Sequence, residues 1–242
     1  MAGRRILITR AQDDAELWAE HLTALGATPV VFPCIVSEPI DDVAVAVALH
    51  RGLTDTHWLL VTSPRTAAAI ARLLTGTVPA DVRIAAVGVA TAHACIALLG
   101  RADFVSPVAT SAALGAALGE LLQNAGTAAT TRVVIAGALG GRDDAQDTLI
   151  AQGVSVTRIN VYRTRPSPAV ERPRDLAVIG IDDVLLASPS AVTGLLNTAI
   201  VPDGARVITI GPTTSAAAIA AGLCVFAEAR QPTFEGVLEA LS

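Results

Sequence analysis

Two Ser-Pro pairs stand where apolar segments give way to helix-forming residues. Ser63-Pro64 follows the apolar run 58–61, and Ser188-Pro189 follows the run 183–186. Serine just before a helix accepts a backbone N–H bond, and proline at the first helical position has no N–H to leave unpaired. One such pair is usually only a helix cap. Two such pairs, together with the two glycine-initiated helix starts below, weigh a binding site evenly against plain helix caps, because helix starts present free N–H groups and a positive dipole end to anions.

Further residues repeat this chemistry. The segments 88–91 and 211–214 each follow an apolar run, begin with glycine and contain threonine. All 17 basic residues are arginine, and three of them stand in such turns or just past them. The sequence therefore predicts a polyanion site that uses backbone amides, hydroxyls and guanidinium groups. The candidate binding residues are Arg10, Ser63, Arg65, Thr91, Arg142, Ser188, Thr213 and Thr214.

Other kinds of site have weaker signals. No Ser–His–Asp or paired-carboxylate motif is present, and the glycine-rich stretch 137–141 lacks the lysine of a P-loop. The three cysteines have no CxxC spacing and share no ligand spacing with the four histidines, so we expect no metal site and buried free thiols in a reducing cytoplasm. Tyr162 is the only tyrosine. From the residues alone, it is best interpreted as a half-buried strand tyrosine.

The elements that must position these residues form a repeat. Segment 5–35 resembles 132–162, segment 57–74 resembles 183–197, and segment 83–100 resembles 206–222. Gly26 and Gly153 coincide in the first pair, where each is expected to end a helix. We infer an internal duplication. Each copy alternates continuous apolar strands with helices, which predicts an α/β fold with parallel sheets covered on both faces. In such sheets, ligands bind beyond the carboxyl ends of the strands.

Composition excludes several classes of protein. The chain has 242 residues, of which 52% are hydrophobic and 16% charged, so a disordered protein is excluded. A net charge of −5 argues against binding nucleic acid through an overall positive field. The longest uncharged stretch, 84–100, is interrupted by glycine, threonine and histidine, which indicates a strand, a turn and a helix rather than a membrane span. Acidic residues follow the N-terminus too closely for a secretory signal.

Taken in order, these motifs resemble the uroporphyrinogen-III synthase family. The matching residues are Ile8-Thr9-Arg10, Gly26 with Pro33, 58–67, Val87-Gly88 with Thr91-Ala92, Gly137 to Arg142-Asp143, Val161-Tyr162-Arg163-Thr164, Ala187 to Ser190, Ile210 to Thr214, and Pro232-Thr233. They run nearly end to end. Ala11 departs from the pattern, since proline often follows the Thr-Arg pair in this family.

The resemblance implies an architecture that the repeat alone leaves open. It implies two flavodoxin-like parallel-sheet domains joined by two crossing extended linkers, at about 32–40 and 159–167. One domain is then discontinuous, with residues 1–35 and 167–242, and the other comprises 36–160. The first repeat copy would pack with the later copies of the other two segments.

The resemblance also implies a reaction. The family cyclises hydroxymethylbilane, a linear tetrapyrrole with carboxylate side arms, to uroporphyrinogen III. Water is lost, ring D is inverted and no cofactor is needed. On this basis Tyr162 is expected to donate a proton to the departing hydroxyl, and the candidate binding residues to hold carboxylates. We expect a monomer that binds neither a membrane nor nucleic acid. The preceding pathway enzyme, which would hand over the substrate, is a candidate partner.

Three alternatives remain open at this point. The same fold with a changed cleft would serve as a non-catalytic tetrapyrrole or small-ligand sensor. A flavodoxin-like redox protein is disfavoured because aromatic residues make up only 3% of the chain. A periplasmic-type sensor is disfavoured by the N-terminal sequence.

Overall fold

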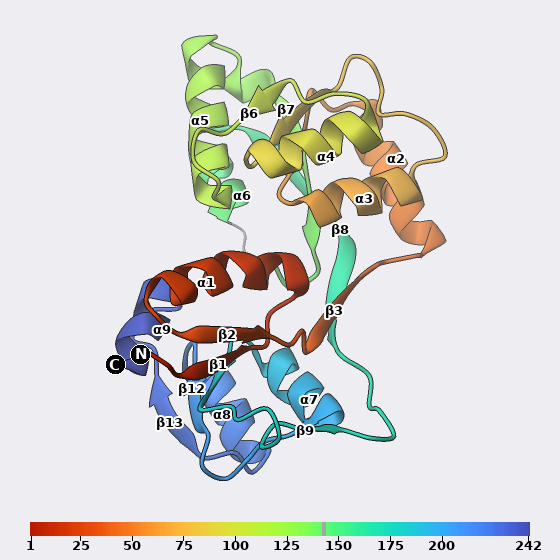
Figure 1. Ribbon diagram of the computed structural model, residues 1–242. Coiled ribbons are helices and arrows are strands. Elements are labelled where there is room, and N and C mark those ends of the chain that lie inside the picture. Colours follow the sequence, from red (N-terminus) through yellow and green to blue (C-terminus); the bar gives the residue numbers. More distant parts are fainter. Residues whose placement is uncertain (142–143) are drawn as a thin grey trace. The chain divides into compact units, whose positions relative to one another are not determined.

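The chain is described here from a computed structural model. The structure describes residues 1–141 and 144–242, except for the side chain of Asp13. The chain divides into two compact units (Figure 1). Unit 1 comprises Met1–Ser37 and Thr164–Ser242, and unit 2 comprises Glu38–Arg163.

Unit 1 is built on a sheet of parallel strands in the order β13-β12-β10-β1-β2. The strands are β1 (Arg5–Ile8), β2 (Thr28–Val31), β10 (Asp183–Leu186), β12 (Arg206–Thr209) and β13 (Val225–Glu228). The helices are α1 (Gln12–Ala24), α7 (Pro189–Thr198), α8 (Pro212–Ala220) and α9 (Phe234–Leu241), and the short strands β9 (Arg174–Asp175) and β11 (Ala199–Ile200) pair separately. Counted along the unit, the strand order is that of a flavodoxin-like sheet.

Unit 2 is built on a sheet with the order β3-β8-β7-β4-β5-β6. The strands are β3 (Ile35–Pro39), β4 (Trp58–Val61), β5 (Arg83–Ala86), β6 (Phe104–Val105), β7 (Arg132–Ala138) and β8 (Ser155–Pro166). The helices are α2 (Val43–Thr54), α3 (Pro64–Leu73), α4 (Val89–Leu99), α5 (Ser111–Asn124), the short 3₁₀ turn η1 (Ala128–Thr130) and α6 (Asp144–Ala151). The chain passes between the units in β3 and in β8, which are neighbours in this sheet.

The two sheets show the duplication directly. Strands β2-β1-β10-β12-β13 of unit 1 correspond in order to β8-β7-β4-β5-β6 of unit 2. The first repeat copy therefore pairs with the later copies of the other segments. Local geometry repeats as well, since Gly26 and Gly153 follow α1 and α6 with φ of 81° and 80°. These left-handed conformations explain glycine at both positions.

Each sheet is covered on both faces, which confirms the predicted α/β class. In unit 1, α1 and α9 pack on one face, and α7 and α8 pack on the other (Figure 1). In unit 2, helices α2, α3 and α4 cover one face, which we call the α3 face, while α5 and α6 cover the other, the α5 face. The inner strands β1, β10 and β12 of unit 1 and β4, β5 and β7 of unit 2 are therefore largely buried and apolar, whereas β8 and the edge strand β13 alternate between more and less buried residues.

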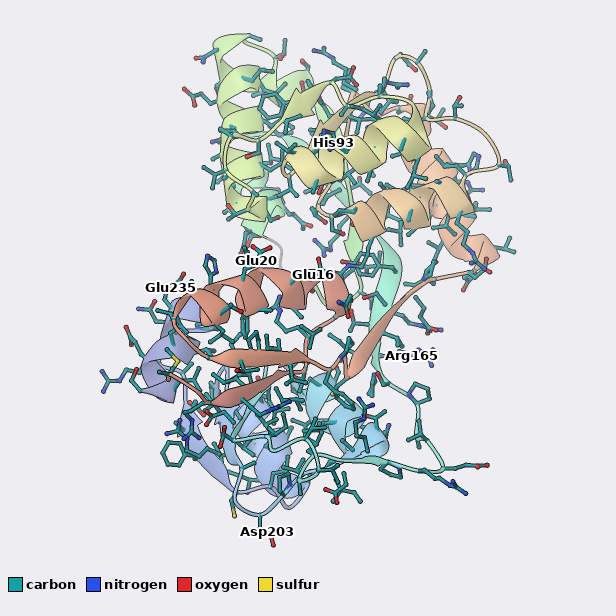
Figure 2. The ribbon with its side chains drawn as sticks, in the orientation of Figure 1. Glu16, Glu20, His93, Arg165, Asp203 and Glu235 are labelled. Atoms are coloured by element: carbon teal, nitrogen blue, oxygen red, sulfur yellow. The ribbon has the colours of Figure 1, made fainter. Side chains whose placement is uncertain are left out.

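Charged side chains lie on the outer sides of the covering helices. On α1, Trp18 and Leu22 are buried, whereas Glu16 and Glu20 are exposed and point away from the sheet (Figure 2). None of the described helices is both long and apolar enough to cross a membrane.

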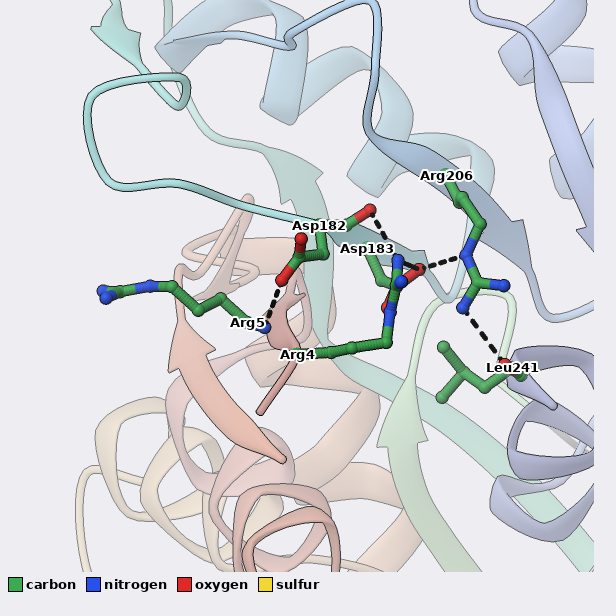
Figure 3. Close-up of polar contacts among 6 residues, drawn as sticks. All are labelled: Arg4, Arg5, Asp182, Asp183, Arg206 and Leu241. Atoms are coloured by element: carbon green, nitrogen blue, oxygen red, sulfur yellow. Dashed lines mark hydrogen bonds and ion pairs between the residues drawn. The ribbon is translucent and has the colours of Figure 1, made fainter. Parts of the chain in front are cut away.

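One charge is buried at the amino-terminal edge of the unit 1 sheet. The Asp183 carboxylate, with no exposed surface, lies between two arginines (Figure 3). Arg4 Nε and Nη2 donate to it at 2.6 and 2.9 Å, and Arg206 Nε donates at 2.7 Å. Arg206 also donates to the carbonyl of Leu241 in α9, at 3.1 Å. This network ties β1, β10, β12 and α9 together.

Candidate active site

The predicted binding residues lie where parallel α/β sheets bind ligands. The strand order reverses between β1 and β10 in unit 1 and between β4 and β7 in unit 2. Ligands bind beyond the carboxyl ends of strands at such points, because the loops diverge there and helix starts face the opening. Each unit therefore carries one set of strand-end residues.

The Ser-Pro pairs form the helix caps that the sequence predicts. Ser63 Oγ accepts the Thr66 N–H at 3.1 Å, and Ser188 Oγ accepts the Ala191 N–H at 3.1 Å. Both serines are only partly buried. A capping hydroxyl still has its own proton to donate, so each serine can cap its helix and offer a hydrogen bond to an anion.

The glycine-initiated helices have no such cap. Helix α4 begins after Gly88 and α8 after Gly211, and neither has a side-chain cap among the described residues. The backbone at the two glycines is nearly the same, with φ of 175° and 165° and ψ of 178° at both. A Cβ added at Gly211 would meet nothing within 4 Å. At α4 the first bond of the helix runs from Ala92 N–H to the Gly88 carbonyl, so the amides of 89–91 are left for water or a ligand. At α8, Pro212 has no N–H and the Thr214 N–H donates to the Gly211 carbonyl at 3.0 Å, so the amide of Thr213 is the one left, with open space beside Gly211.

The three threonines at these helix starts differ in accessibility. Thr91 and Thr214 occupy the third position of α4 and α8 and are only 2% and 1% exposed. Thr213, at the second position of α8, is exposed. The buried side chains of Thr91 and Thr214 pack within their units in this structure. The exposed Thr213 hydroxyl can contact a ligand directly.

The predicted arginines are held in different ways. Arg10 follows β1, with its guanidinium stacked 4.7 Å from the centre of the Trp18 ring and Nη2 3.7 Å from Asp14 Oδ2. Arg65 is the second residue of α3 and is partly buried. Arg142 lies outside the described residues. Arg10 is thus braced against α1 at the carboxyl end of the sheet.

Tyr162 lies on β8 beside an irregularity in strand pairing. Asn160 pairs with Gly137, but the next pair is Tyr162 with Ala138, so Val161 is an extra residue on β8. Val161 is fully buried in the α3-face cluster, and the partly buried Tyr162 ring packs against the same cluster. Successive residues of a regular strand point to opposite faces. This β-bulge therefore turns Tyr162 to the α3 face, next to the carboxyl ends of β7 and β4.

The cysteines differ from the sequence prediction at one position, since Cys34 and Cys95 are buried but Cys224, next to the edge strand β13, is exposed. In the described parts of the chain, no group of three or more His, Cys, Asp or Glu residues is arranged to hold a metal. Cys34, Cys95 and Cys224 are free, and burial raises the pKa of Cys34 to about 12 and that of Cys95 to about 11. These two thiols stay protonated at neutral pH.

Comparison with known proteins decides the family. A family model described as uroporphyrinogen-III synthase HemD matches residues 16–239, which is nearly the whole chain. The chain belongs to the uroporphyrinogen-III synthase family. The match extends from α1 to α9 and includes every candidate site residue except Arg10.

The chain is also similar to individual proteins in sequence or in fold. The porphyrin biosynthesis protein HemD of Ruminiclostridium josui is 26% identical over 167 residues, or 67% of this chain and 32% of that protein, so the chain spans about a third of its length. Uroporphyrinogen-III synthetase from Helicobacter pylori has a similar structure, with a TM-score of 0.52 and 14% identity over 98% of this chain and 97% of the other. This likeness shows the two-domain α/β fold. A mutant uroporphyrinogen III synthase from Thermus thermophilus gives a TM-score of 0.49 and 18% identity over 99% and 97% of the chains.

The structure also places near Tyr162 a residue that sequence reasoning missed. Arg158 lies on β8, and its guanidinium donates to the carbonyl of Ala138 at 3.2 Å and to Asn160 Oδ1 at 3.3 Å. Arg158 and Asn160 alternate with apolar residues along β8, Asn160 is the register partner of Gly137, and the guanidinium of Arg158 lies against Gly137 and Gly141. That pairing of polar strand residues with glycines is the only signal the sequence carries for this contact.

Proposed function

We propose that this chain cyclises hydroxymethylbilane to uroporphyrinogen III, with loss of water and inversion of ring D. The observation that carries the proposal is the family match over residues 16–239, which includes Tyr162 and every strand-end candidate except Arg10. The duplicated helix starts with free amides and hydroxyls support it, because they suit a substrate with carboxylates along its length.

The proposed chemistry begins at the hydroxymethyl group. The carbon–oxygen bond breaks, the phenol of Tyr162 donates a proton to the departing hydroxyl, and water leaves. The remaining azafulvenium cation is attacked by ring D through its substituted α-carbon, which forms a spiro intermediate. One bond of the spiro centre then breaks and re-forms at the free α-carbon of ring D. The proton lost there balances the proton that Tyr162 supplied, so the net change is loss of one water.

Positioning has the larger part in this reaction. Hydroxymethylbilane closes without an enzyme to the type I isomer, so an enzyme must select one closure geometry over another. Fixed amides at α4 and α8, together with hydroxyls such as Ser63, Ser188 and Thr213, would hold the carboxylates and orient ring D. The net charge of −5 gives no long-range attraction for this substrate, but screening within about 10 Å leaves local donors in control.

The direct test generates hydroxymethylbilane in situ, adds the protein, oxidises the products and separates the type I and type III isomers. Predominant type III product is the expected result. Type I alone, formed at the rate of the blank, would contradict the proposal. Binding of the unreacted substrate in that case would favour a ligand sensor.

Replacing the phenol of Tyr162 tests the acid. Tyr162→Phe removes only the hydroxyl and keeps the ring packed against the α3-face cluster. Loss of a general acid lowers kcat by about 100-fold, with little change in KM. An unchanged melting temperature is the control for packing. Equal turnover by the variant and the wild type would remove Tyr162 from the chemical step.

We also propose a monomer in a reducing compartment, where a substrate that closes spontaneously is handed over by the enzyme that makes it. The three free cysteines support the reducing compartment. Light scattering tests the monomer. The hand-over is tested by comparing two reactions. In one, the producing enzyme and this protein are mixed from the start, and in the other this protein is added after the substrate has formed. Hand-over predicts slower formation of the type I isomer in the mixed reaction.

A further inference from the structure

We propose that Arg158 is a positioning residue for Tyr162: it braces the β-bulge that turns the phenol to the α3 face. The predicted effect of Arg158 on catalysis rests on the proposed function. The predicted effect of Arg158 on the position of Tyr162 does not. The inference starts from the bulge, because a regular β8 would point Tyr162 to the face opposite Val161.

Arg158 lies on the other side of the sheet from Tyr162. It pairs with Ile135, whose side chain belongs to the α5-face cluster, and register partners in a parallel sheet share a face. Its guanidinium runs along that face towards the carboxyl end of β7. Arg158 therefore does not pack beside the phenol, and any effect on Tyr162 must pass through the backbone.

The backbone contacts that link the two residues centre on Ala138. Arg158 Nη2 donates to the Ala138 carbonyl at 3.2 Å, and Ala138 is the register partner of Tyr162. The next amide, Leu139 N–H, donates to the Tyr162 carbonyl at 2.8 Å. Arg158 Nε also donates to Asn160 Oδ1 at 3.3 Å, on the strand residue just before the bulge. One guanidinium thus holds both strands at the point where the register shifts.

Two glycines make room for this guanidinium. A Cβ on Gly137 would lie 3.3 Å from Arg158 Nη2, and a Cβ on Gly141 would lie 2.9 Å from it. Neither glycine has a clash with buried helix packing that would require its small size, and Gly137 has no positive φ. The space they leave is filled by the guanidinium, which explains glycine at 137 as an adaptation to Arg158.

The test uses the fact that Tyr162 is the only tyrosine in the chain. Uniform incorporation of 3-fluorotyrosine gives a single ¹⁹F resonance, from residue 162. In Arg158→Met, which keeps the length of the side chain and removes its donors, we expect that resonance to shift or broaden. Arg72→Met is the matched control, because Arg72 is exposed on α3 and pairs with Asp41 in the same unit. It should leave the resonance unchanged.

The catalytic readout is a double-mutant cycle. Arg158→Met should lower kcat about tenfold and raise the type I fraction of product, with KM changed less than about twofold. In the Tyr162→Phe background the same substitution should have little further effect on kcat, because the group that it positions is gone. Additive effects, or a resonance unchanged in Arg158→Met, would overturn the inference.

A milder variant keeps the test decisive if Arg158→Met does not fold. Gly137→Ala displaces the guanidinium by a few tenths of an ångström and should produce the same changes at smaller size, about threefold in kcat. An unmoved resonance and unchanged kcat in Gly137→Ala would also overturn the inference. If the wild type forms no type III product, the proposed function fails, while the ¹⁹F comparison still decides whether Arg158 holds Tyr162.

Discussion

At the amino-terminal edge of each sheet, an arginine that begins one strand lies beside the first residue of the neighbouring strand. The residue beside the arginine differs between the two units. In unit 1, Asp183 of β10 is the register partner of Arg206 of β12, and the pair is ionic. In unit 2, Trp58 of β4 is the register partner of Arg83 of β5, and the guanidinium lies 4.7 Å from the centre of the indole ring. The arginine is common to both copies, and its partner is not.

The end of a sheet is thus covered in two ways, by an aromatic ring in unit 2 and by an ion pair in unit 1. The indole of Trp58 covers the end of the unit 2 sheet and brings its own apolar surface into the core. The Asp183 carboxylate has no exposed surface, and the two guanidinium groups must compensate for its lost hydration. The ionic version is therefore more sensitive to loss of one member and to pH than the aromatic version.

The carboxyl ends differ in a similar way. Arg10 follows β1 in unit 1, whereas the corresponding position in unit 2 is Gly137, and the guanidinium there comes from Arg158 on the neighbouring β8. The residue that corresponds to Arg158 is Val31, since Ile8 pairs with Val31 as Ile135 pairs with Arg158. Each unit has an arginine at the carboxyl end of its sheet. In unit 1 it follows the first strand of the repeat, β1, whereas in unit 2 it lies on the second strand of the repeat, β8.

The largest expected effect is loss of the charge in unit 1. Asp183→Asn leaves two arginines without their carboxylate, and we expect unit 1 to lose about 3 kcal/mol of stability. Trp18 lies in unit 1 and Trp58 in unit 2, and they are the only tryptophans. Urea unfolding in a Trp58→Phe background therefore follows unit 1 alone. Asp203→Asn, an exposed carboxylate of the same unit (Figure 2), is the control. A similar loss in both variants would contradict a special role for Asp183.

The second expectation is a pH dependence confined to unit 1. Burial alone would raise the pKa of Asp183, but hydrogen bonds and charges from Arg4 and Arg206 lower it below its ordinary value. The unfolded state then takes up the proton first. The stability that Asp183 contributes is complete above about pH 4 and is lost as pH falls through the folded-state pKa. The stability gap between wild type and Asp183→Asn should therefore be constant from pH 7 to about 5 and shrink below about 4. A gap that is constant down to pH 2 would contradict this.

Much of this architecture can be predicted from the sequence, because local signals specify it. The Ser-Pro pairs and the glycines that follow the helices act within a few residues, and the structure has caps at Ser63 and Ser188 and left-handed glycines at 26 and 153. The pairing of β1 with β10 has no local signal. It was implied by the family resemblance, since a tandem repeat alone allows two simple halves as well.

The parts that sequence reasoning missed depend on contacts over long distances along the chain. Five strands begin with an arginine, at positions 5, 83, 132, 174 and 206. Nothing local indicates that Asp183 pairs with Arg4 as well as with Arg206. The bulge at Val161 has no turn residue to mark it. Thr91 and Thr214, which the sequence predicts as ligand contacts, are buried at their helix starts, and the sequence alone does not distinguish a buried threonine from an exposed one there.

The smallest expected effect concerns the residue before each central strand. In unit 1 the Arg5 N–H donates to Asp182 Oδ2 at 2.7 Å, and in unit 2 the Arg132 N–H donates to His57 Nδ1 at 3.0 Å. An aspartate and a histidine thus accept the same strand amide. If the acceptor is what the position requires, His57→Ala should lower the stability of unit 2 by about 0.5–1 kcal/mol.

His57→Asp should recover at least half of that loss, because it places in unit 2 the acceptor that unit 1 already uses. Urea unfolding followed through Trp58 in a Trp18→Phe background measures both variants. His93→Ala is the control, since His93 is exposed on α4 (Figure 2), away from the strand amides. Equal losses in His57→Ala and His57→Asp would show that the imidazole contributes something other than an acceptor. The two units would then differ at this position too, as they do at Asp183 and Trp58.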